Sequence, residues 1–376
     1  MHISAAAWTM TTITDSPTLV GLVQTAWAVP GFLLALYAGA FADMVDLRRL
    51  ISITSLLALV VAALMAVLQW SGGLTAEFLI LGTFLESIAL TLSAPAFMAL
   101  TPELVDEPRL AQAIGLDAVS RNIAQSIGPA IGGAIIAIIN PGAVFALNAV
   151  SFVGIVLVMQ TSKSTIRRDL SNSAKTSEIN QVIKVGVQQV VGTKLLRNLV
   201  LRLAIMLAVT SVLTAVLPIV AKESLDVASN GYGLLSGALG VGSVAAVWVL
   251  PRIRAKLNIE TITLSSAGIW SASTVLLSAT ANMVVALIAL FICGACIMAM
   301  LNTLFSTFMV RLPNVVRGRG SSLAMLMVWL GIALGTFIWG AVTSSVGVGQ
   351  ALVIAAATNF GLALFNRVAL RITISH

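Results

Sequence analysis

Residues 50–70 read LISITSLLALVVAALMAVLQW, a stretch without a single charged side chain. A helix of about 20 residues rises about 30 Å, which is the thickness of the hydrocarbon core of a bilayer. Similar runs fill the chain of 376 residues, which is 59% hydrophobic and only 9% charged, with a mean hydropathy of +1.03. Soluble domains carry about 25% charged residues. The sequence therefore predicts an all-α integral membrane protein.

The apolar runs predict eleven complete membrane-spanning helices, five before a polar segment and six after it. Turn-forming residues such as Asn140-Pro141-Gly142 divide the runs that are too long for one helix. The polar segment is rich in Ser, Asn, Thr, Lys and Arg, which is typical of a linker. The predicted organisation is an N-terminal helix bundle at 1–161, a linker at 162–197 and a C-terminal six-helix bundle at 198–376.

The basic residues predict the orientation in the membrane. When the helices alternate in direction from the linker, nearly all of the 21 Lys and Arg residues fall on the linker side, with Lys222 on the other. Such a bias in short loops marks the cytoplasmic side. We therefore expect the linker and the C-terminus to face the cytoplasm from the inner (plasma) membrane. Both bundles then share one in-out sense, as in the parallel repeats of secondary transporters.

The first 14 residues, MHISAAAWTMTTIT, are apolar but too short to cross a bilayer. No basic residues precede the apolar part, as they would in a signal peptide. We interpret this segment as the outer half of a truncated first helix, so that the full fold would have twelve helices in two six-helix bundles. An inactive truncated product is the alternative interpretation.

The loop before residue 50 carries a recognisable pattern, GAFADMVDLRR at residues 39–49. Gly39 and Asp43 match the signature loop of the major facilitator superfamily, G-x-x-x-D-R-x-G-R-R, and Arg48 and Arg49 resemble its arginine pair, shifted by one position. The acid at position 46, where the superfamily usually has glycine, is similar to the enterobactin-exporter-like branch of its multidrug efflux proteins. The chain thus resembles this branch over nearly its whole length.

The resemblance implies a conformational gate at this loop. It places Asp43 beside the start of the eleventh helix, near Gly320. The N-terminus of a helix has unpaired N–H groups and the positive end of the dipole, both of which attract a carboxylate. This contact would hold the two bundles together in one state and break in the other. A solvated loop acid is the alternative.

A second motif lies in the predicted fifth helix. Gly128, Pro129, Gly132 and Gly133 resemble the fifth-helix motif of exporters in the superfamily, which implies a pivot where helices approach closely. Close helix packing without a pivot is the alternative. An offset of 207 residues lays this GPAIGG stretch over GTFIWG at 335–340. The matched positions within the two halves indicate an internal repeat.

Charged and polar residues inside the spans are candidate proton or substrate sites. A charge at the bilayer centre costs about 2.5–3.5 kcal/mol on insertion scales. Glu86 is the deepest acid, suited to carry a proton or meet a cationic substrate, with a buried ion pair as the alternative. Asp117 and Arg121 lie four residues apart and are expected to pair, whereas Arg202 is expected to extend to the membrane surface. Asn302 is expected to contact either substrate or another helix.

The sequence offers little for a membrane-embedded enzyme. It has no phosphate-binding loop, metal-ligand cluster or nucleophile triad, and its histidines are only His2 and His376. Cys293 and Cys296 form C-x-x-C in an apolar run with no partner, which favours simple packing over redox or metal chemistry. We therefore expect neither a metal nor a cofactor, and the charge pattern argues against nucleic acid.

These observations favour a monomeric secondary active transporter. Since no nucleotide-binding segment is recognisable, an ion gradient, with the proton as coupling ion, is the expected energy source. The resemblance implies export of a small amphipathic molecule, a drug or siderophore-like compound, by alternating access. The lipid bilayer and this substrate are the expected partners. A lysolipid or metabolite carrier on the same fold is the alternative.

Overall fold

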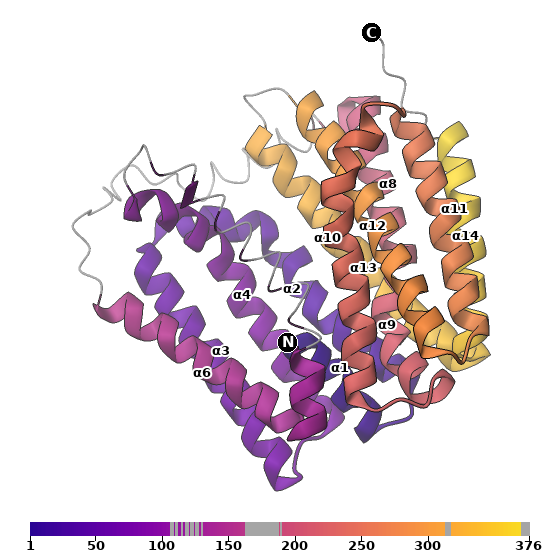
Figure 1. Cartoon of the computed structure of the whole chain (residues 1–376). Coiled ribbons are helices and arrows are strands. Elements are labelled where there is room, and N and C mark those ends of the chain that lie inside the picture. Colours follow the sequence, from indigo (N-terminus) through magenta and orange to yellow (C-terminus); the bar gives the residue numbers. More distant parts are fainter. Residues whose placement is uncertain are drawn as a thin grey trace.

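The computed structural model describes residues 1–105, 131–161, 190–312 and 317–369, together with isolated residues between 106 and 130 and at 188. Every regular element among them is a helix, which confirms the all-α prediction. In the N-terminal half these are α1 (His2–Ile13), α2 (Pro17–Met44), α3 (Leu47–Ser71), α4 (Ala76–Leu104) and α6 (Pro141–Thr161) (Figure 1). In the C-terminal half these are α8 (Lys194–Thr210), α9 (Val212–Ile219), the π-helical turn η3 (Val220–Ser224), α10 (Ser229–Arg254), α11 (Ile259–Ala279), α12 (Met283–Arg311), α13 (Arg317–Val346) and α14 (Val348–Ala369).

The described residues contain ten helical segments long and apolar enough to cross a membrane. They coincide with ten of the eleven predicted spans. The remaining one, predicted between Ala111 and the turn at Asn140, falls largely outside the described residues, although 131–138 are helical. Helix α8 begins at Lys194, so the last residues of the predicted linker belong to a helix.

Short polar caps set the ends of the helices. The Asp46 carboxylate accepts a 2.8 Å hydrogen bond from the backbone N–H of Arg49 and so caps the start of α3. Gly72 ends the same helix with a φ of 73°, a left-handed conformation that favours glycine. Asn282 caps α12 by accepting from the backbone N–H of Val284. Antiparallel helices therefore follow one another with connections of only a few residues.

The first span of the C-terminal half is irregular. Its 31 residues, Lys194–Ser224, form α8, α9 and η3 in succession. Pro218 lies inside α9 and has no N–H for the helical ladder. The π-helical turn begins two residues later, at Val220. Prolines and π-helical turns are the usual causes of kinks, and here both occur where the span packs against α2 of the other half.

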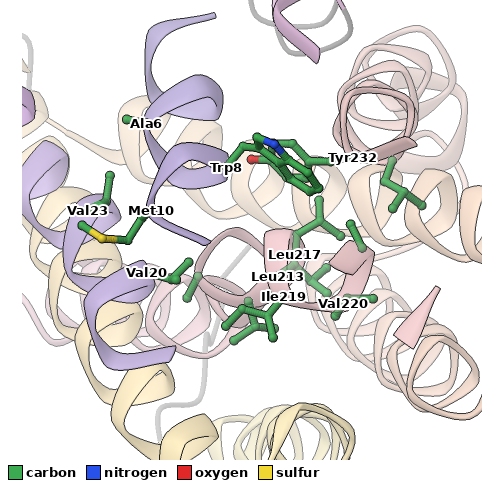
Figure 2. Close-up of a cluster of buried hydrophobic side chains, with 14 of the residues drawn as sticks. Ala6, Trp8, Met10, Val20, Val23, Leu213, Leu217, Ile219, Val220 and Tyr232 are labelled. Carbon is green, nitrogen blue, oxygen red and sulfur yellow. The ribbon is translucent and has the colours of Figure 1, made fainter. Parts of the chain in front are cut away.

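The helices gather into two halves that meet at one end (Figure 1). We call the end that carries residues 45–46, 255–258 and 312 the linker end, and the other the opposite end. Helix α2 packs along α13, and α1 packs against α9 and α10. Trp8 of α1 stacks on Tyr232 of α10 with ring centroids 5.5 Å apart (Figure 2). A continuous apolar core therefore joins the halves.

The outer faces of the helices are also apolar. Ile138, Val310 and Trp248 are 82%, 77% and 76% exposed. Water would penalise so much exposed apolar surface by about 25 cal/mol per Å². A bilayer does not, so these residues mark the surface in contact with lipid.

Candidate functional site

Glu86 lies at the centre of a buried polar cluster formed by three helices. It is 1% exposed on α4. One carboxylate oxygen, Oε2, is 3.0 Å from Nδ1 of His2 on α1. The other, Oε1, accepts a 2.7 Å hydrogen bond from the side-chain amide of Asn148 on α6. The cluster therefore gives this carboxylate two polar partners, which offset the cost of burying it.

Aromatic rings enclose the cluster. The His2 ring stacks on Trp27, with centroids 6.1 Å apart, and packs against Phe145 at 5.3 Å. Its Nε2 is buried and has no hydrogen-bond partner in the described part of the chain. The rings exclude water from a carboxylate and an imidazole, the two side chains best suited to take and release a proton.

The contact between His2 and Glu86 is close but is not a hydrogen bond. Nδ1 of His2 lies 3.0 Å from Oε2 of Glu86, and Oε2 has no hydrogen-bond partner within the described part of the chain. Asn148 donates to Oε1, and an amide NH₂ can donate to a neutral or an ionised carboxyl. The hydrogen bond from Asn148 is therefore compatible with either charge state of Glu86.

A cavity of about 220 Å³ lies between the two halves. Ile3 and Ser4, which directly follow His2, line it from α1. The Tyr232 hydroxyl is within hydrogen-bonding reach of Ser4 and Ser236. Other polar residues that line the cavity are Gln24, Thr214, Ser236 and Ser243. The described lining is uncharged and rich in hydroxyl groups, which suits a small molecule with both apolar and hydrogen-bonding parts.

The halves touch most closely at the opposite end, through glycine backbones. A Cβ added at Gly133 would lie 2.5 Å from Gly233 Cα on α10, and one added at Gly21 of α2 would lie 3.0 Å from Gly340 Cα on α13. One turn beyond Gly21, the Thr25 hydroxyl is 2.9 Å from that of Thr336. Only glycine permits helices to approach so closely.

An ion pair lies beside these contacts. Lys222, in η3, donates to the Asp15 carboxylate at 3.1 Å and to the backbone carbonyl of Thr11 at 2.7 Å. Asp15 is almost fully exposed, so the pair is weak, at about 0–1 kcal/mol. The contact between the halves at this end is thus close but can be separated.

The predicted gate loop is described only in part. Gly39 and Asp43 belong to the last two turns of α2, and Arg48 and Arg49 to the first turn of α3. The side chain of Asp43 lies outside the described part, so its expected contact with the start of α13 stays a prediction. Asp46, which departs from the superfamily pattern, is the N-cap of α3.

The described glycines of the predicted fifth-helix motif pack against two different neighbours. Gly128 and Gly132 lie against Met1, since a Cβ added at either would be 3.3–3.5 Å from the Met1 backbone. Gly133 faces α10 of the other half. Pro129, Asp117 and Arg121 lie outside the described residues. Asn302 is partly buried on α12 and is not among the residues that line the cavity between the halves.

The expectation for Arg202 is wrong. Its side chain is buried rather than extended to the membrane surface. It donates to Glu260 of α11, with N–O distances of 3.0 Å to both carboxylate oxygens, and to the backbone carbonyl of Asn366 in α14. A charged residue near a helix end reaches the surface only if no partner is closer, and here two other helices supply partners.

Sequence reasoning also missed His2 as a partner of Glu86. The segment around His2 indicates only a truncated helix, and a single histidine gives no metal or catalytic pattern. Asn148 offers a weak signal, because it is a polar residue in the middle of an apolar span. What joins them is the packing of α1 and α6 on α4, which sequence spacing does not encode.

Comparison with known proteins gives a consistent result. The family model described as "Transmembrane secretion effector", one of the MFS families, matches residues 1–375. The chain is 25% identical over 247 residues to the Staphyloferrin A transporter of Staphylococcus aureus, covering 65% of this chain and 61% of that protein. It is 27% identical over 236 residues to an uncharacterized MFS-type transporter of Sinorhizobium fredii, covering 62% and 57%. The chain thus spans about three fifths of the length of these curated relatives.

Solved structures share the fold. The nucleoside transporter NupG superposes with a TM-score of 0.75 at 12% identity, covering 99% of this chain and 95% of that one. A bacterial homolog of the human lysosomal transporter Spinster, in an inward-facing and unoccupied conformation, gives 0.73 at 13% identity, with coverage of 98% and 95%. At such identities the likeness concerns the fold alone.

Proposed function

Because the chain belongs to the transmembrane secretion effector family of MFS transporters, we propose that it exports a small molecule by alternating access in exchange for protons. The protein is a membrane transporter and not an enzyme. The observation that carries the proposal is the buried cluster of Glu86, His2 and Asn148 next to the cavity between the halves.

The cluster supports proton coupling through its position. His2 directly precedes Ile3 and Ser4, which line the cavity, so a substrate bound there would contact the same helix, α1, that carries His2. When Glu86 is protonated, its carboxyl carries no charge and is compatible with apolar surroundings. When Glu86 is ionised, its charge requires polar groups around it. Protonation from one side and release to the other would therefore bias which side the cavity faces.

Alternation requires that the contacts at the opposite end separate. The glycine contacts and the Lys222–Asp15 pair hold the halves together there. In our proposal, opening at this end accompanies closure at the linker end, where Asp43 meets the start of α13 as the resemblance implies. Gly39, Arg48 and Arg49 would shape and anchor that loop.

The substrate is proposed to be an amphipathic, siderophore-like or drug-like compound. The uncharged, hydroxyl-rich lining of the cavity supports this class. The relative named as a Staphyloferrin A transporter supports a siderophore-like substrate. The basic residues support a cytoplasmic linker and C-terminus in the plasma membrane. Export as the direction rests on the resemblance of the loop at 39–49 and of the fifth-helix motif to exporters.

The experiment uses proteoliposomes that contain the full chain, an imposed pH gradient, and staphyloferrin A and ethidium as probes. Wild type should concentrate a transported probe against its gradient, whereas Glu86→Gln should bind and exchange the probe without concentrating it. Glu77→Gln removes an exposed acid from the first turn of the same helix and is the matched control. A Glu86→Gln protein that responds to the gradient as wild type does would make Glu86 structural.

A further inference from the structure

A second cavity, of about 520 Å³, lies at the linker end of the C-terminal half. The last turn of α10, the first turns of α11 and the last turns of α12 enclose it. All of its described lining residues belong to the C-terminal half. This cavity is therefore separate from the one between the halves, and the transport proposal does not use it.

Two guanidinium groups give this cavity a positive character. Arg254 and Arg311 both line it. Arg254 Nε donates to the Thr303 hydroxyl at 3.4 Å, and its Nη2 is buried with no hydrogen-bond partner in the described part of the chain. A charged donor left without an acceptor costs free energy, so the site is better satisfied with an anion present.

The cavity has one acid in its described lining, and that acid is already paired. Glu260 contacts Arg202 through both carboxylate oxygens, on the side of α11 that faces α8. The N-terminus of α11, capped by Asn258, adds the positive end of a helix dipole. Ser306 and Thr307 donate their hydroxyl protons to backbone carbonyls of α12. The donors left for a ligand are therefore mainly the two arginines.

The rim of the cavity is apolar and faces outward. Val310 and Leu257 line the cavity and are 77% and 44% exposed. These residues lie at the end of membrane-spanning helices, where lipid headgroups meet acyl chains. An anion bound here has apolar surface beside it. The acyl chains of a lipid can pack on that surface, whereas an inorganic ion cannot.

We propose that this cavity binds the phosphate group of an anionic membrane phospholipid. The guanidinium groups of Arg254 and Arg311 hold the phosphate oxygens, since arginine donates to phosphate in a bidentate geometry. The acyl chains lie along Val310 and Leu257. A phospholipid and a free phosphate ion would both present phosphate oxygens to the arginines. The apolar rim favours the phospholipid as the ligand.

The experiment measures binding of radiolabelled phosphatidylglycerol to the purified full chain in detergent micelles. We expect saturable binding to wild type, with Arg254→Gln weakening it about tenfold and the double variant with Arg311→Gln weakening it further, as the loss of charge-assisted hydrogen bonds predicts. Arg252→Gln is the matched control, because Arg252 is exposed, lies half a turn away and donates to the Trp248 carbonyl. Thermal unfolding of each variant checks that it is folded.

Three results would overturn the proposal. Equal loss in Arg252→Gln and Arg254→Gln would show general attraction to a basic surface and remove the site. Displacement of the lipid by inorganic phosphate at similar concentration would assign the site to free phosphate and remove the lipid as its ligand. Absence of saturable binding to wild type would refute the proposal outright. Proton-driven transport by the same variants is a separate readout and does not enter this test.

Discussion

The closest backbone contact between the halves gives the sharpest test of alternating access. In Gly133→Ala the new Cβ would lie 2.5 Å from Gly233 Cα and 2.8 Å from the Ser229 carbonyl oxygen, all on rigid backbone. Ordinary contacts of this kind begin near 3.4 Å, so the helices must separate by roughly 1 Å. Overpacking of this size costs about 1–3 kcal/mol. Since the strain exists only while this end is closed, it should shift the equilibrium about 5–150-fold toward the state open there.

Spin labels at Thr12 and Glu223 report the shift, because both residues are exposed at the opposite end and belong to different halves. Gly133→Ala should add a longer distance to the measured distribution. Gly154→Ala on α6 is the matched control, since no atom lies within 4 Å of its added Cβ. If both variants give the wild-type distribution, the contact at Gly133 does not hold the halves together.

Changes at single sites test the gate, the buried ion pair and the topology. Asp43→Asn should lower transport several-fold while expression stays normal, because it removes a charge worth about 0.3–2 kcal/mol at a helix N-terminus; wild-type transport would refute the gate. Arg202→Met should lower the thermal unfolding temperature because it leaves the Glu260 carboxylate without its guanidinium, and Arg202→Met with Glu260→Gln should recover part of the loss; no recovery would refute the pairing. Single cysteines at Ser173 and Ser345 should react with an impermeant reagent from opposite sides, and labelling from the same side would refute the topology.

The sequence was sufficient for the helices because each of them is encoded locally. A charge-free run such as 50–70 is helical in a bilayer whatever its neighbours, since its backbone groups must pair within the segment. Caps such as Asp46 and Gly72 are local as well. Partners across helices are different: Glu86 and His2 are far apart in the chain, and only the packing of α1 on α4 brings them to 3.0 Å. The same holds for Arg202 and Glu260.

The internal repeat is the exception, because it carries information about contacts between helices. The offset of 207 residues places Gly128 over Gly335 and Gly133 over Gly340. In space, Gly128 lies against Met1 at the start of its own half, and Gly335 lies against Ala208 of α8, the first helix of the other half. Gly133 and Gly340 both contact the partner half. In each half, the first of the two glycines therefore packs within its own half, and the second packs against the partner half. An alanine at Gly340 should accordingly open the opposite end as Gly133→Ala does, but less, because its Cβ would meet the Pro17 carbonyl oxygen at 3.1 Å rather than a backbone carbon at 2.5 Å.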